Sequence, residues 1–261
     1  MNSSFINEGY NILAALIYVT ETESDAVQRM FDWQPVNIEG DDQQYYEAYV
    51  ERDDDLLRII AAQQDEMGMT AAATLSMKII HNFRPKYLIM PGIAAGAEEE
   101  REDGEMFGDV VLATSVWNYS NGKYVSPHHA EIVFGEIGFI PRPSMIDIDE
   151  NLISVFQRII DMNETECHIH MGPLASGSTV VANKHFLDKQ VRTNYHDTKG
   201  LDMESYGVAY AARHATEPRP MAIIAKSVCD FADERKDDRY QQFAAYTSCE
   251  LVGYLVKEVL S

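Results

Sequence analysis

The segment that most constrains the fold is a short apolar run that ends in carboxylates, residues 221–233, with the sequence MAIIAKSVCDFAD. Residues 221–225 predict a buried strand, because the run is short, continuous and preceded by Pro220. In an open α/β sheet, ligands bind in the crevice beyond the carboxyl ends of the strands. Asp230, which follows this strand, either exchanges protons with a ligand or caps the next helix, and the spacing alone leaves both interpretations open.

A second carboxylate occurs in an apolar setting. Residues 200–212 read GLDMESYGVAYAA, in which Glu204 lies among small and apolar side chains. An unpaired buried carboxylate is costly, so Glu204 needs a hydrogen-bond donor. The donor is either a backbone N–H at a helix start or the hydroxyl groups of a ligand.

The rest of the chain alternates between strand and helix patterns. Further strands are predicted at residues 10–18, 56–62, 86–90 and 108–114, and a glycine-rich turn is predicted at residues 91–97. Helices are predicted at residues 70–83, 149–162 and 237–260, and a further helix is predicted to begin near Ser24 or Asp25. This alternation predicts an α/β fold, a single-domain three-layer sandwich with a mixed, largely parallel central sheet flanked by helices. We expect residues 1–9 to form a loose N-terminal arm and residues 10–261 to form the domain.

Composition excludes several classes of function. The chain carries 42 acidic against 21 basic residues, a net charge of −21, which disfavours nucleic-acid binding. No apolar run approaches the roughly 18 residues that a membrane-spanning helix needs. The first residues lack the basic region and apolar core of a signal peptide, and three cysteines form no paired framework. We therefore expect a cytoplasmic protein that binds neither nucleic acid nor membrane.

Four motifs carry a resemblance to a known family. LDMES and SVCDFAD resemble the M-E and S-D-x-A-D signatures of the purine nucleoside phosphorylase / methylthioadenosine–adenosylhomocysteine nucleosidase superfamily. PKYLIMPGIAAGA with GDVVLAT, and GPLASGSTVVAN, resemble two further motifs of that superfamily, and all occur in the family's order across residues 10–260. The resemblance implies the nucleoside phosphorylase fold and cleavage of a purine N-glycosidic bond. The stretch CDFADERKDDRYQQFAAYTSCEL is similar to a branch found in receiver-domain fusions and in effectors of bacterial antiviral defence.

The resemblance also implies roles for individual residues. Asp230 corresponds to the acid that protonates the leaving base at N7, and Glu23 to the group that orients or deprotonates water, with Glu21 as its competitor. Glu204 corresponds to the acceptor of hydrogen bonds from the ribose 2′- and 3′-hydroxyls, and Met203 packs against the sugar. Val180, Val181 and Cys229 are expected to contact the base. The floor of the pocket is expected to be lined by Gly92, Ala94, Ala95 and Gly96.

The sequence departs from the family in two places. Many relatives have serine where this chain has Cys229, which is a weaker hydrogen-bond donor. Phosphorylases of the superfamily grip phosphate with a loop that contains glycine and arginine, whereas residues 18–23 read YVTETE. Two carboxylates there repel phosphate and supply a base for water, so hydrolysis is favoured over phosphorolysis.

The substrate stays open at this point. The candidate cations for a nucleotide phosphate are Lys123, Lys226, Arg235 and Lys236, each of which is also explained as a surface residue. The immune-effector branch implies adenine nucleotides, with ATP among the candidates; a housekeeping nucleosidase implies methylthioadenosine or adenosylhomocysteine. A sensor that binds nucleosides without turnover is the alternative from another class.

No cofactor or metal is expected. The adjacent His128 and His129 have no spaced thiol or acidic partner, and His168 and His170 are interpreted as packed or surface residues on one face of a strand. Residues 117–127 are predicted to form a loop. In relatives, the equivalent region covers the neighbouring subunit's site, which implies a homo-oligomer of at least two subunits.

Overall fold

The computed structural model describes residue 6 and residues 8–52, 55–97, 104–134, 137–234 and 237–260. The strands of the main sheet are β1 (Ile12–Tyr18), β2 (Gln34–Ile38), β3 (Asp41–Arg52), β4 (Asp55–Gln63), β5 (Pro85–Gly96), β6 (Val110–Asn118), β10 (Met145–Asp147), β11 (Ile169–Ser176), β12 (Gly200–Asp202) and β13 (Met221–Asp230). A smaller sheet contains β7 (Gly122–Val125), β8 (Ile132–Phe134) and β9 (Ile137–Pro141). The helices are α2 (Glu21–Gln28), α3 (Met69–Phe83), α4 (Glu150–Met162), α5 (Lys184–Phe186), α6 (Ser205–His214) and α7 (Gln241–Tyr254), with shorter helical stretches at Pro127–His129, Leu187–Arg192 and Leu255–Val259.

The main sheet is mixed. Its strands follow the order β10-β6-β11-β12-β5-β1-β4-β3-β2, and β13 pairs with both β5 and β6. β5 runs parallel to β1 and β13, and β11 runs parallel to β6 and β12. β13 and β6 are antiparallel, as are β12 and β5. This arrangement brings the carboxyl end of β13 beside the ends of β5 and β12.

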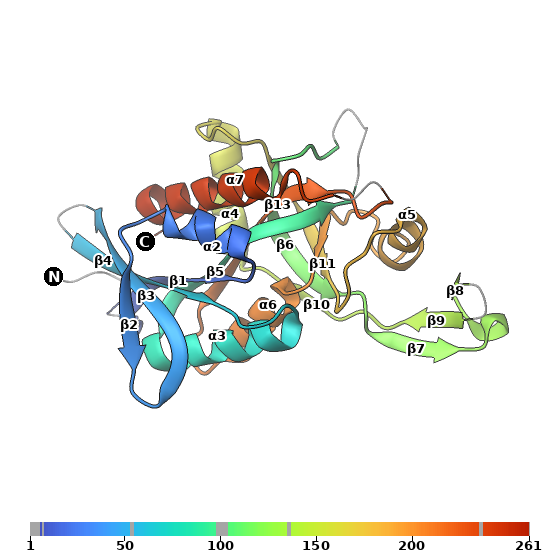
Figure 1. The fold of residues 1–261 in the computed structure, drawn as a ribbon, viewed down its shortest axis with the longest axis horizontal. Coiled ribbons are helices and arrows are strands. Elements are labelled where there is room, and N and C mark those ends of the chain that lie inside the picture. Colours follow the sequence, from blue (N-terminus) through green and yellow to red (C-terminus); the bar gives the residue numbers. More distant parts are fainter. Residues whose placement is uncertain are drawn as a thin grey trace.

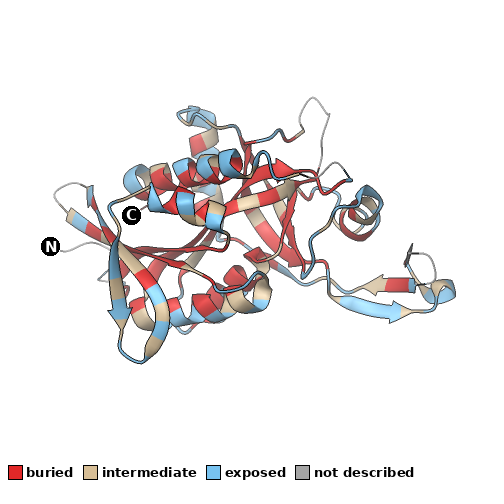
Figure 2. Ribbon diagram, in the orientation of Figure 1, coloured by how far each residue is buried: buried red, intermediate tan, exposed pale blue. Residues whose placement is uncertain are grey.

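Helices cover both faces of the sheet (Figure 1). Apolar side chains of α2, α4 and α7 pack against one face, and those of α3 and α6 pack against the other. Buried residues are concentrated in the sheet between these two layers (Figure 2). The predicted α/β fold, a three-layer sandwich with a mixed central sheet, is confirmed.

Three local expectations were wrong. The turn predicted at residues 91–97 is part of β5, because β13 pairs with this strand as far as Ala95 and holds it extended. Helix α2 begins at Glu21, because the Thr20 side chain caps it and Glu23 completes a capping box. Part of the segment predicted as a loop at 117–127 forms β7, which pairs with β9.

The sheet of β7, β8 and β9 projects from the body of the molecule as an arm (Figure 1). Tyr124 on this arm is 74% exposed. The homo-oligomer expected from this region stays a prediction. The arm predicted for residues 1–9 lies largely outside the described residues. None of the described helices combines the length and the apolar character needed to cross a membrane.

Candidate functional site

A cavity of about 280 Å³ lies at the carboxyl end of β13. Its lining includes the carboxylates Glu23, Asp202, Glu204, Asp230 and Asp238. Among the described lining residues none is lysine or arginine. Six of the other residues predicted for the site also line it: Ala94, Ala95, Val180, Val181, Met203 and Cys229. Gly92, Gly96 and Lys226 are not among its lining residues, contrary to the floor position predicted for the two glycines.

A β-bulge directs Asp230 toward the cavity. The register between β13 and β5 shifts between Val228 and Asp230, and such a bulge re-aims the side chains that follow it. Oδ1 of Asp230 accepts a hydrogen bond of 2.8 Å from the backbone N–H of Ala232, whose φ of 53° is left-handed. Asp230 therefore closes a local turn. It does not cap α7, whose N-cap residue is Tyr240, so the capping interpretation was wrong.

Backbone amides hold the Glu23 carboxylate at the wall of the cavity. Oε2 accepts hydrogen bonds from the N–H groups of Val19 and Thr20, at 2.9 and 3.0 Å. Oε1 accepts one from the N–H of Ile93 at 2.9 Å. Because each carboxylate oxygen has two lone pairs, both lone pairs of Oε2 are used, and one remains on Oε1 for a further donor such as water. Glu21, the competitor, is exposed and does not line the cavity.

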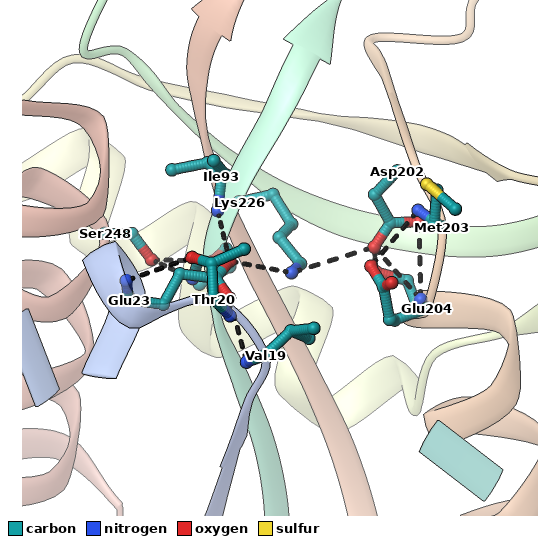
Figure 3. A network of polar contacts seen from close by, with 12 residues as sticks. Val19, Thr20, Glu23, Ile93, Asp202, Met203, Glu204, Lys226 and Ser248 are labelled. Atoms are coloured by element: carbon teal, nitrogen blue, oxygen red, sulfur yellow. Dashed lines mark hydrogen bonds and ion pairs between the residues drawn. The ribbon is translucent and has the colours of Figure 1, made fainter. Parts of the chain in front are cut away.

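Lys226 connects the two sides of the site. Its Nζ lies 3.6 Å from Oε1 of Glu23 and 3.8 Å from Oδ2 of Asp202, and its side chain is 1% exposed. Figure 3 shows it extending between these two carboxylates. Burial opposes the charged form, but Glu23, Asp202 and Glu204 together outweigh burial and raise the pKa of Lys226. The surface position weighed for this lysine was therefore wrong.

Asp202 is a site residue that sequence reasoning missed. Its carboxylate accepts hydrogen bonds from the Ser176 hydroxyl at 2.6 Å and from the N–H and hydroxyl of Ser205. These bonds join the end of β12 to β11 and to the start of α6. The signal that could have found it is the aspartate two positions before Glu204 in LDMES.

Glu204 lies in the bend between β12 and α6. Its Oε1 accepts a hydrogen bond of 2.8 Å from the N–H of Gly68, and its side chain does not cap α6. The pKa of Glu204 is raised to about 7, first by burial and then by the negative charge of Asp202, against the opposing effect of Lys226. Glu204 thus changes charge near neutral pH.

This pKa predicts a pH-dependent affinity for ribose hydroxyls. These hydroxyls donate hydrogen bonds to an ionised carboxylate, so a carbon-linked nucleoside analogue that cannot be cleaved should bind about tenfold more tightly at pH 8 than at pH 6. Calorimetric titration at both pH values measures this change. The Glu204→Gln variant serves as the control and should bind weakly with little pH dependence; a tenfold change retained in that variant would contradict the assignment.

The raised pKa of Glu204 also predicts how the free energy of unfolding changes with pH. Glu204 has a higher pKa in the folded chain than its ordinary 4.5, so its contribution to folding is present below pH 4.5 and is lost as the pH rises through about 7. The free energy of unfolding should therefore fall more steeply over this interval in the unaltered protein than in Glu204→Gln.

Gly92 permits the close approach of Glu23 and Lys226. Its φ is +142°, and a Cβ built there would lie 2.0 Å from Oε1 of Glu23 and 2.8 Å from Nζ of Lys226. Glu23 cannot move away without losing its backbone hydrogen bonds. We expect Gly92→Ala to lower turnover about 100-fold, because a displacement of about 1 Å at a reacting group has that effect.

Gly40→Ala is the matched control for Gly92→Ala. Gly40 also has a left-handed φ, +82°, but a Cβ there meets nothing within 4 Å. This control should lose some stability and keep its turnover. Equal turnover in the two variants would show that Gly92 does not position Glu23.

An aromatic residue that sequence reasoning also missed forms a wall of the cavity. Tyr119 lines it, and its hydroxyl donates a hydrogen bond of 3.1 Å to the carbonyl of Thr179. A Cβ at Gly177 would lie 1.9 Å from the Tyr119 ring, so glycine is required for this contact. Tyr119 thus supports the segment that carries Val180 and Val181.

The sequence of this chain is similar to those of known proteins. Residues 37–261 match the model of the Phosphorylase superfamily. The chain is 30% identical over 245 residues to the uncharacterized protein y4jS of Sinorhizobium fredii, which covers 88% of this chain and 57% of that protein. It is 22% identical over 226 residues to the ATP nucleosidase Cap17 of Escherichia coli, covering 77% of this chain and 42% of that protein. The chain thus spans about half the length of these two relatives.

The fold is also found in a solved structure. The 5′-methylthioadenosine/S-adenosylhomocysteine nucleosidase of Neisseria meningitidis, in complex with methylthio-immucillin-A, superposes with a TM-score of 0.73 at 24% identity. The alignment covers 94% of this chain and 98% of the other.

Proposed function

This chain belongs to the phosphorylase superfamily, and on that premise we propose that it hydrolyses the N-glycosidic bond of a purine nucleoside and releases the free base. The observation that carries the proposal is the convergence of Asp230, Glu204 and Glu23 on one cavity from three separate parts of the chain. Its relatives include proteins named as nucleosidases.

Cleavage places three demands on the site, and each falls to one carboxyl group. Asp230 donates a proton to N7, so that the base leaves without negative charge. Glu204, when ionised, accepts the ribose hydroxyls and holds the sugar as positive charge develops at the anomeric carbon. Glu23, fixed by three backbone amides, orients water and takes its proton.

The remaining lining residues bind and orient the substrate. In this proposal Met203 packs against the sugar, and Val180 and Val181, which also line the cavity, contact the base. The Cys229 thiol donates a hydrogen bond of 3.4 Å to Oδ2 of Asp230 and helps to orient that carboxyl group. Lys226 is a positioning residue, because it lies between Glu23 and Asp202 and is not among the lining residues.

Charge in the cavity supports water as the acceptor. Five carboxylates line it, and its described lining has no lysine or arginine to hold inorganic phosphate. The same charge favours a nucleoside with an uncharged 5′ substituent over a nucleotide. A nucleotide would need the cations Arg235 and Lys236, which lie outside the described residues.

A product assay tests the proposed function. The purified chain is incubated separately with methylthioadenosine, adenosine, AMP and ATP, and free base is measured by chromatography. We expect adenine release to be fastest from methylthioadenosine and adenosine. Release from ATP alone would overturn the inferred 5′ preference. If calorimetry showed tight nucleoside binding but no base were released over hours, the protein would be a nucleoside sensor and not an enzyme.

A further inference from the structure

Two histidines and one aspartate converge at the start of β6 and β11. Asp109 immediately precedes β6, and His168 and His170 lie at the start of β11, which pairs in parallel with β6. Nε2 of His170 lies 2.8 Å from Oδ2 of Asp109, and Nδ1 of His168 lies 3.5 Å from the same oxygen. These three candidate ligand atoms all lie within 4.8 Å of one another.

The cluster is anchored on its inner side and open on its outer side. The side chains of Asp109 and His170 are each 8% exposed, whereas that of His168 is 67% exposed. The N–H of Met106 donates a hydrogen bond of 2.9 Å to Oδ2 of Asp109 and so fixes the carboxylate. A hydrogen bond from His170 would by itself satisfy this oxygen. The imidazole of His168 also faces this oxygen, from the solvent side, and a bound cation would explain why two imidazoles meet one carboxylate oxygen.

From these distances we propose that Asp109, His168 and His170 form a Zn²⁺ site with a coordination position open to water. Zn²⁺ binds imidazole nitrogen and carboxylate oxygen at about 2.0–2.2 Å, which places tetrahedral ligand atoms about 3.3 Å apart. The separations of 2.8 and 3.5 Å lie on either side of that value. Two histidines and a carboxylate with an open position are a known ligand set for Zn²⁺.

The surroundings favour a cation. The neighbouring cavity, of about 460 Å³, is lined by Asp109 and His168 together with Glu164, Glu166 and Glu250. Its described lining includes no lysine or arginine. The negative potential of these carboxylates attracts a divalent ion and offsets part of its charge.

The ion stabilises the fold and takes no part in cleavage. None of its three ligands lines the candidate active-site cavity. The carbonyl of Asp109 accepts a hydrogen bond of 2.9 Å from the N–H of Val228, two residues before Asp230. A metal bound at Asp109 therefore ties β6 and β11 to the end of β13 and rigidifies the strand that carries the proposed acid.

Metal titration of the whole chain, with any affinity tag removed, tests the proposal. The protein is stripped with a chelator, and Zn²⁺ is titrated against a chromogenic competitor while thermal unfolding is followed in parallel. We expect one ion per chain and a rise in Tm on binding. His168→Gln/His170→Gln should bind at least about 100-fold more weakly and show no Tm rise.

His128→Gln/His129→Gln is the matched control. It also removes two neighbouring histidines, both exposed, and should bind Zn²⁺ as the unaltered protein does. The single variant His168→Gln changes only an exposed side chain and so tests binding in a chain that folds. Absence of stoichiometric binding, or equal binding by His168→Gln/His170→Gln, would overturn the site. Neither outcome depends on base release, so the proposed function is tested separately.

Discussion

The Asp230→Asn variant is expected to release purine base about 10²–10⁴-fold more slowly than the unaltered protein, with its fold unchanged. Asparagine keeps an oxygen that can accept the hydrogen bond from the N–H of Ala232, so the turn at the end of β13 survives. It has no acidic proton to donate to N7. Single-turnover base release, with circular dichroism of the same sample, measures both effects.

A change of leaving group separates acid catalysis from binding. The nitrophenolate of a nitrophenyl riboside leaves without being protonated, so Asp230→Asn should cleave this substrate nearly as fast as the unaltered protein does. Asp237→Asn is the matched control, because Asp237 pairs with Arg239 outside the cavity lining, and it should keep full turnover of purine nucleosides. Near-normal purine release by Asp230→Asn would remove Asp230 as the acid.

The Lys226→Met variant is expected to lose about 3–5 kcal/mol of unfolding free energy, together with most of its turnover. Methionine matches the length of the side chain but leaves Glu23 and Asp202 facing each other without the buried ammonium. Removal of one partner from a buried ion pair leaves an uncompensated charge, and that is the source of the loss. Urea unfolding gives the free energy.

Lys86→Met provides the comparison for Lys226→Met. Lys86 pairs with Glu8 at 3.0 Å, but the side chain of Glu8 is 52% exposed and stays hydrated when its partner is lost. This variant should lose about 1 kcal/mol or less. Similar losses in the two methionine variants would show that the charges around Lys226 are not coupled.

Lys226→Met also has a consequence for Glu204. The ammonium lowers the pKa of Glu204, so its removal should move the pH midpoint of nucleoside-analogue binding above 7. This shift would not follow from a loss of packing alone. It therefore distinguishes an electrostatic role of Lys226 from a steric one.

The strands and their terminal carboxylates could be predicted from the sequence because both depend on local patterns. The apolar run before Asp230 forms β13, and Glu204 is buried as its apolar neighbours suggested. The bulge that directs Asp230 could not be predicted, because it depends on the register between β13 and β5.

The position of Lys226 required long-range information. In the sequence it resembles an ordinary surface lysine, and only the pairing of Lys226 with Gly92 and the packing of α2 bring Glu23 beside it. The extension of β5 through residues 91–96 has the same origin, because pairing with β13 overrides the preference of glycine for turns.

The histidines illustrate the same limit. The alternation of His168 and His170 predicts that they share one face of a strand, and both contact Asp109. Asp109 immediately precedes a different strand, β6, and only the parallel register of β6 and β11 brings it to them. A metal search limited to neighbouring sequence positions therefore finds two ligands and misses the third.

Cleavage in ¹⁸O-labelled water tests the central claim most directly. The purified chain is incubated with methylthioadenosine in labelled water, with and without inorganic phosphate, and both products are analysed by mass spectrometry. Hydrolysis predicts free adenine and a sugar that carries one ¹⁸O, at rates that phosphate does not change. An unlabelled sugar phosphate, formed only when phosphate is present, would contradict the account and identify a phosphorylase.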